Sequence, residues 1–401
     1  GGAVTTAGTV TTAGDINIDA FTTDATIGDV VTSTGSDVEI NAEVNVGLGA
    51  NVIGDNVTAQ ANTGDVNVTA ALNNTRGGYD FSAAGDIDVD ADIVADGAIA
   101  LQSDTNSDGA ATDLVEISAA ALTAGLDIDM VGAVELGAAT IWTSNNGNIT
   151  IANDVDANTF ALTIAADQGN AALPSITGAS TALTVGASTA TLNGGTITTA
   201  GTIDFTGTDL TTLAASTVTV TSGDNPIDFG DLGGANALIV AAGIGAVTFD
   251  GGDIGELTVT AANVNFDEGF NTAGQISVTS TATITVGAAS NVTAEAALEF
   301  SGVDVNIDGS VTGHSVAVTG ATTLAGTING NDGDVTLNSS VAVDGDSNVS
   351  SDNGNVTFND AVEGDFELTA DAPTGTVTFI STVGATTELS GLDVNADVLV
   401  L

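Results

Sequence analysis

The sequence has almost no positive charge. Of its 401 residues, 52 are Asp or Glu and only Arg76 is a Lys or Arg, so the formal net charge is −51. Nucleic acids and anionic membrane surfaces are bound through Lys and Arg, so the composition excludes both as partners. Cations and basic partners are favoured instead. The acidic content itself is ordinary, so we rank an extracellular origin above adaptation to high salt.

Cysteine is absent, which excludes disulfides, thiolate metal sites and cysteine nucleophiles. Apolar runs near the roughly 20 residues of a membrane helix are also absent, so membrane insertion is not expected. Aromatic residues are only 3%, as in many disordered chains, but 43% of residues are hydrophobic and regularly placed, which favours order. Because the sequence has no start methionine and stops within a strand-like pattern, we expect residues 1–401 to be one continuous repeat domain from a longer protein.

A short phrase, Gly-x-(Ile/Val)-x-apolar, recurs along the chain. It reads GDVTL from Gly333, GNVTF from Gly354 and GTVTF from Gly375, and both steps are 21 residues. The same step separates Gly64 from Gly85. Apolar and polar residues alternate inside each phrase, as in a strand with one buried face. Glycine recurs where the chain is expected to turn.

The period selects one all-β architecture. Propeller blades repeat at roughly 40 residues or more, whereas three short strands with their turns need about 21, so we predict a parallel β-helix (β-solenoid) of roughly 19 coils. Such a rod would be about 90 Å long, and its charge would gather cations. Equivalent residues should stack, with two apolar columns inside and one threonine ladder outside: Val335, Val356 and Val377; Leu337, Phe358 and Phe379; Thr336, Thr357 and Thr378.

Residues 104–116, DTNSDGAATDLVE, begin like a calcium loop, with oxygen ligands at alternate positions and Gly109 at the sixth. The closing acid should stand at Val115, but the Glu comes one place later, and Asp113 is an alternative. The predicted ligands of Ca²⁺, the one cofactor that the sequence suggests, are Asp104, Asn106, Asp108 and Glu116. Chance also explains the match, because the chain is rich in Asp, Asn and Gly.

Other polar residues have structural interpretations. A row of four acids at steps of two is expected on one strand face, solvated and relieved by cations: Asp86, Asp88, Asp90 and Asp92. His314, the only histidine, is expected at a turn before a strand, since nothing nearby completes a catalytic triad. Arg76 is expected in a local salt bridge in a Gly-rich turn with Tyr79 and Asp80. Flat threonine arrays, as on ice-binding solenoids, do not persist in every coil.

The segment GNVTFNDAVEGDFELTADAPTGTVTFISTVGATTELSGLDVNAD, residues 354–397, resembles the repeats of giant secreted bacterial proteins of the filamentous-haemagglutinin and autotransporter-adhesin type. The resemblance lies in Gly-(Asn/Asp/Thr)-Val-Thr-Phe and the phrase that follows it. It is clearest over about 330–400 and weaker elsewhere. It implies right-handed parallel β-helices exported as long fibres. The secretion domain of that family is absent here, as expected for a fragment.

Three functions fit these observations. The first is a non-catalytic structural rod of an extracellular filament, sheath or surface coat, self-associating head to tail or laterally with the help of cations. The second is the stalk of a bacterial adhesin. The third is a carbohydrate-active β-helix enzyme, for which the sequence offers one arginine and no lysine to hold an acidic substrate. The expected location is extracellular or at the cell surface.

Overall fold

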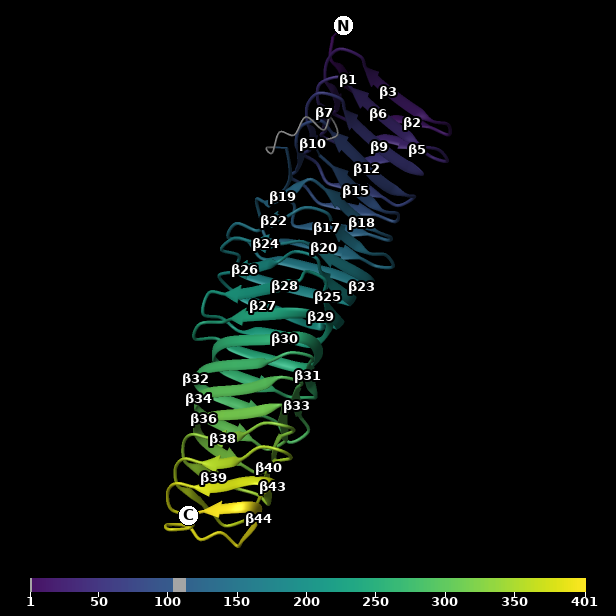
Figure 1. Cartoon of the computed structure of the whole chain (residues 1–401). Helices are drawn as coiled ribbons and strands as arrows, with labels where there is room; N and C mark the ends of the chain where they lie inside the picture. The colour runs from purple at the N-terminus through teal and green to yellow at the C-terminus, as the bar shows by residue number, and fades with distance from the viewer. Residues whose placement is uncertain (1, 104–112) are drawn as a thin grey trace. The chain divides into compact units, whose positions relative to one another are not determined.

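The computed structural model describes residues 2–103 and 113–401 (Figure 1). Their regular structure is entirely β-strand, and this described part contains no helix. The chain divides into two compact units, residues 1–210 and 211–401. Each unit is a solenoid of parallel strands, and the chain has about 18 turns roughly 21 residues apart, so the predicted β-solenoid is confirmed.

The strands of unit 1 are short in its first coils and longer toward its end. They are β1 (Val4–Thr6), β2 (Val10–Thr12), β3 (Ile16–Ala20), β4 (Ala25–Ile27), β5 (Val31–Ser33), β6 (Val38–Ala42), β7 (Val46–Leu48), β8 (Val52–Ile53), β9 (Asn56–Ala61), β10 (Val66–Val68), β11 (Leu72–Asn74), β12 (Gly78–Ala83), β13 (Ile87–Val89), β14 (Ile93–Ala95), β15 (Ile99–Gln102), β16 (Leu114–Ile117), β17 (Ala121–Ala124), β18 (Ile128–Val131), β19 (Ala133–Leu136), β20 (Thr140–Ser144), β21 (Ile149–Ile151), β22 (Val155–Asp156), β23 (Leu162–Leu173), β24 (Ile176–Thr177), β25 (Ala182–Leu192), β26 (Thr196–Thr199) and β27 (Thr202–Leu213), which reaches the boundary.

In unit 2, strands often continue through a corner of the coil. They are β28 (Thr217–Ser222), β29 (Ile227–Ala241), β30 (Ala246–Phe266), β31 (Phe270–Thr272), β32 (Ile276–Val286), β33 (Asn291–Ala294), β34 (Ala297–Ile307), β35 (Ser310–Gly313), β36 (Ser315–Leu324), β37 (Thr327–Gly330), β38 (Val335–Leu337), β39 (Val341–Val343), β40 (Ser347–Ser351), β41 (Val356–Phe358), β42 (Val362–Gly364), β43 (Glu367–Phe379) and β44 (Gly391–Val400).

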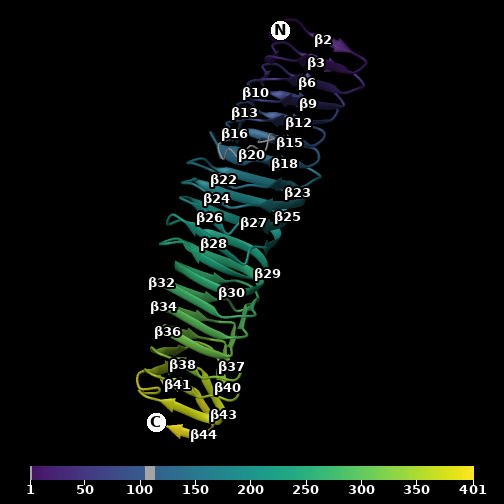
Figure 2. The ribbon, with the colours of Figure 1, turned by 45° about the horizontal axis from the view of Figure 1, so that its top comes forward.

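Each early coil of unit 1 has three strands, and each strand pairs in parallel with the third strand after it. The first face of the solenoid contains β7, β10, β13, β16, β19 and β22. The third face contains β6, β9, β12 and β15, which lie side by side in both ribbon views (Figures 1 and 2). Alternating side chains point inward, so one half of every strand forms the core and the other half is available to solvent.

The stacked columns predicted for unit 2 are confirmed. The three valines pair in register and are fully buried, as are Leu337 and Phe358, while Phe379 is 3% exposed. The rings of Phe358 and Phe379 stack with their centroids 4.7 Å apart. The three threonines between them are half-buried on the outer surface. Burial of these columns is the main favourable term that the fold supplies.

The recurring glycine has a different reason from the expected turn. Neither Gly354 nor Gly375 has a positive φ. A Cβ added to Gly354 would lie 2.4 Å from the carbonyl carbon of Gly333, and one added to Gly375 would lie 2.0 Å from the carbonyl oxygen of Gly354. Glycine therefore recurs because successive coils approach too closely for any side chain.

Candidate functional site

Asp and Asn side chains join successive coils at the corners before the strands. Asp334 Oδ1 accepts the backbone N–H of Asn355 at 2.9 Å and its side-chain amide at 2.9 Å. Asn355 Oδ1 in turn accepts the backbone N–H of Thr376 at 2.9 Å. We call such a series an Asx ladder. It explains the second letter of the repeated phrase, because an oxygen there satisfies a backbone donor one coil later.

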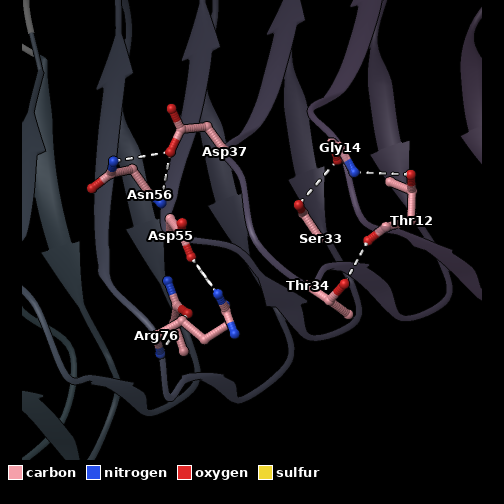
Figure 3. Close-up of polar contacts among 9 residues, drawn as sticks. Thr12, Gly14, Ser33, Thr34, Asp37, Asp55, Asn56 and Arg76 are labelled. Atoms are coloured by element: carbon pink, nitrogen blue, oxygen red, sulfur yellow. Dashed lines mark hydrogen bonds and ion pairs between the residues drawn. The ribbon is translucent and has the colours of Figure 1, made fainter.

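A longer Asx ladder runs along the first face of unit 1. Its members are Asp24, Asn45, Asp65 and Asp86, and each accepts the backbone N–H of the equivalent residue in the next coil, ending at Leu114. Asp37 does the same for the backbone and side chain of Asn56 (Figure 3). These acids thus have a structural task. The sequence contained part of this signal, because Asp65 and Asp86 directly follow the glycine of the repeated phrase at a step of 21.

The same face of unit 1 carries a second series of acids, which we call the acidic column. It consists of Asp88, Glu116, Glu135 and Asp156, which occupy the same register position on β13, β16, β19 and β22. Asp88 and Glu135 are half-buried, and Glu116 and Asp156 are exposed. Like charges directly opposite one another on neighbouring strands repel. Four consecutive coils therefore present one uninterrupted line of carboxylates.

The pKa of Asp88 is raised to about 6, first because burial disfavours its charged form and second because Glu116, Asp86, Asp65 and Asp90 are nearby. Glu363 in unit 2 shows the opposite case. Its pKa is lowered because its carboxylate accepts backbone hydrogen bonds from Thr387, Thr386 and Ala385. Burial and neighbouring acids thus raise the pKa of one carboxyl group, whereas backbone donors lower the pKa of the other.

Of the four predicted calcium ligands, the structure describes only Glu116. Asp104, Asn106 and Asp108 lie outside the described residues. Glu116 is an exposed residue in the middle of the acidic column on β16. Within residues 2–103 and 113–401, no group of three or more His, Cys, Asp or Glu side chains is arranged to hold a metal ion.

The row of four acids does not form one strand face. Strand β13 contains only Asp88 of the four. Asp86 and Asp92 are corner residues whose carboxylates accept the backbone N–H groups of Leu114 and Ala121. The expectation of a continuous row was wrong because the strand is only three residues long, so the chain turns on either side of Asp88.

The structure describes both His314, the only histidine of the sequence, and Arg76, its only Lys or Arg. His314 is exposed between β35 and β36, at the turn that was expected. Arg76 forms a salt bridge, but its partner is Asp55 one coil earlier and not the neighbouring Asp80 (Figure 3). Both Nε and Nη2 of Arg76 donate to Asp55 Oδ1, at 3.0 and 2.7 Å. The bridge is half exposed, so it contributes little to stability.

Arg76 borders a hollow on the side of unit 1. This groove has a volume of about 800 Å³ and lies over β6, β9, β12 and β15. Its polar lining includes Asp37, Glu39, Thr58 and Asp80, and Leu126 contributes an apolar edge. Glu39, Thr58 and Asp80 share one register column, so the groove crosses successive coils. Tyr79 is buried beneath it and donates its hydroxyl to the Val52 carbonyl.

A second hollow of about 280 Å³ adjoins the groove through their shared residue Glu39. Phe21, directly after β3, forms its apolar side and is 83% exposed. Asn41 donates its amide to Asp19 and Glu39, at 3.0 and 2.9 Å. Gln60, in the same column as Asn41, lines the hollow as well. Sequence reasoning missed both hollows, because they depend on residues about 20 apart that meet only when the coils stack.

Comparisons with family models, with curated proteins and with solved structures find no match for this chain. Among the residues that the structure describes, no helix is long and apolar enough to cross a membrane. The β-helical repeat architecture is therefore established by the geometry of the strands, and function has to be argued from the surfaces.

Proposed function

We propose that this chain is a non-catalytic structural segment of an extracellular filament, sheath or surface coat, and that copies add head to tail. The observation that carries the proposal is the apolar surface of β44. Leu392 and Leu399 of β44 are 43% and 47% exposed, whereas their register partners Leu368 and Val377 on β43 are fully buried. These side chains occupy core positions that a further coil would cover.

The first coil of unit 1 shows the same feature. Val10 on β2 is 37% exposed, while its partner Val31 on β5 is fully buried. The terminal strands pair in parallel with their neighbours, so the open edge of a last coil matches the open edge of a first coil. A parallel strand joined from another chain would satisfy backbone groups and bury apolar side chains together.

Charge favours joining at the ends over lateral packing. A net charge of −51 repels another copy of the same chain along its sides, and one arginine cannot offset it. Lateral association is therefore proposed to need divalent cations. The acidic column, which includes the predicted calcium ligand Glu116, is the proposed place where they would bind. The resemblance to adhesin repeats supports an alternative role as an adhesin stalk, in which the open coils continue into more of the same chain.

Sedimentation velocity and negative-stain electron microscopy of the purified chain test this proposal across a wide concentration range, with and without Ca²⁺. We expect concentration-dependent end-to-end oligomers. Leu399→Asp should abolish them, because it places a charge on the surface to be buried. Ile244→Asp is the matched control, since Ile244 is 75% exposed at a turn between β29 and β30. A chain that stays monomeric under all these conditions contradicts the filament role.

A further inference from the structure

We propose that the groove over β6, β9, β12 and β15, together with the adjoining hollow at Phe21, binds a neutral oligosaccharide without cleaving it. This site lies on the side of unit 1 and does not depend on assembly at the terminal coils. Three features of this surface support such a ligand: the only guanidinium of the chain, an exposed aromatic ring and a hollow that crosses several coils.

The groove combines the one guanidinium of the chain with uncharged side-chain donors. Carboxylates only accept hydrogen bonds when ionised, whereas sugar hydroxyls both donate and accept, so a sugar site needs both kinds of partner. The only guanidinium of the chain, that of Arg76, borders the groove. Its bonds to Asp55 use Nε and Nη2 and leave Nη1 without a partner among the described residues. Thr58 and Gln60 add further donors, whereas the Asn41 amide is already bonded to Asp19 and Glu39.

Acceptors lie opposite these donors on the same face. Glu39 and Asp80 are exposed and stand two coils apart in one column, with Thr58 between them. Gly77, Gly78 and Gly97 line one side of the groove, where successive coils pack too closely for a side chain. The hollow thus follows the stacking direction over several coils, which suits an extended chain of sugar rings better than a single small molecule.

Apolar surfaces complete the site. Phe21 is 83% exposed, in contrast to the fully buried phenylalanines of the core such as Phe81. An exposed aromatic ring is a platform for the apolar face of a sugar ring. Leu126, 51% exposed, borders the main groove.

The electrostatics select the class of ligand. Carboxylates at Asp37, Glu39 and Asp80 repel anionic sugars and any second copy of this acidic chain. The whole molecule attracts cations, so charge alone does not direct them to this groove. Within the groove, the positive charge of Arg76 repels them. A neutral ligand rich in hydroxyl groups can form hydrogen bonds with both the carboxylates and the guanidinium of Arg76.

Titration calorimetry with the whole chain tests the proposal, using cellohexaose, maltohexaose, mannohexaose and chitohexaose as neutral probes. Hexagalacturonate and spermine serve as the anionic and cationic probes. We expect at least one neutral probe to bind and to remain chemically intact. Phe21→Ala should weaken its binding about tenfold, and Arg76→Gln should weaken it as well. Phe366→Ala is the matched control, because Phe366 is 39% exposed in unit 2.

Circular dichroism and the fluorescence of the buried Trp142 report whether each variant is folded like the parent chain. Failure of all four neutral probes to bind would overturn the proposal. So would binding of spermine or hexagalacturonate alone, or neutral binding that Phe21→Ala and Arg76→Gln leave unchanged. None of these outcomes bears on end-to-end assembly, which is measured separately.

Discussion

Asp88 is the residue at which the crowding of acids has its clearest energetic consequence. Its folded pKa of about 6 lies above the value near 4 of an unfolded Asp, so between these pH values the folded state binds the proton more tightly. Stability from this group therefore falls as pH rises from about 4 to 6, and the full cost is present at pH 7. Solvent screens a half-exposed group, which keeps the cost to about 1 kcal/mol.

We predict that Asp88→Asn stabilises unit 1 by about that amount at pH 7 and has little effect at pH 4. Urea unfolding followed by Trp142 fluorescence measures both values, since Trp142 lies on β20 of the same unit. Asp167→Asn, at an exposed position of β23 where the register shifts, is the control for a general loss of negative charge. An equal gain at both pH values would show that Asp88 itself is not the cause.

At the same scale, the sequence predicted inward positions better than polar ones. Val356 could be assigned to the core because strand alternation fixes which side chains share a face. The partner of Arg76 could not be assigned, because Asp55 is adjacent only after two coils stack in one register. The role of Asp334 as an acceptor was missed for the same reason.

Among the elements, the Asx ladder makes the sharpest prediction. Asn355→Ala removes the acceptor of the Thr376 N–H and the donor to Asp334, so this exposed corner loses about 1 kcal/mol. We expect faster amide exchange around Thr376 by hydrogen–deuterium exchange mass spectrometry. Asn359→Ala is the control, because the Asn359 amide bonds only the side chain of Asn338. Equal effects of the two substitutions would show that the hydrogen bonds of the Asx ladder are not the cause.

Strand existence and the 21-residue step were predictable from alternation, but strand ends were not. Glycine was expected to mark turns, yet Gly251 and Gly252 both lie within β30. A Cβ on Gly252 would be 2.6 Å from the ring of Phe270. Glycine there leaves room for the ring of a core phenylalanine, and a sequence pattern does not distinguish this use from a turn.

The whole molecule has a charge that its fold must tolerate, and this leads to the last prediction. With 52 acids and one base, folding brings like charges together, whereas unfolding separates them. Salt shortens the range of this repulsion, so raising NaCl from low to moderate concentration should increase the melting temperature by several degrees, measured by far-UV circular dichroism. Ca²⁺ at matched ionic strength should increase it further if carboxylates in register, such as Glu116 and Glu135, share a cation. Choline chloride at the same ionic strength separates screening from cation binding. A melting temperature that does not change with salt would mean that the folded and unfolded chains repel themselves equally.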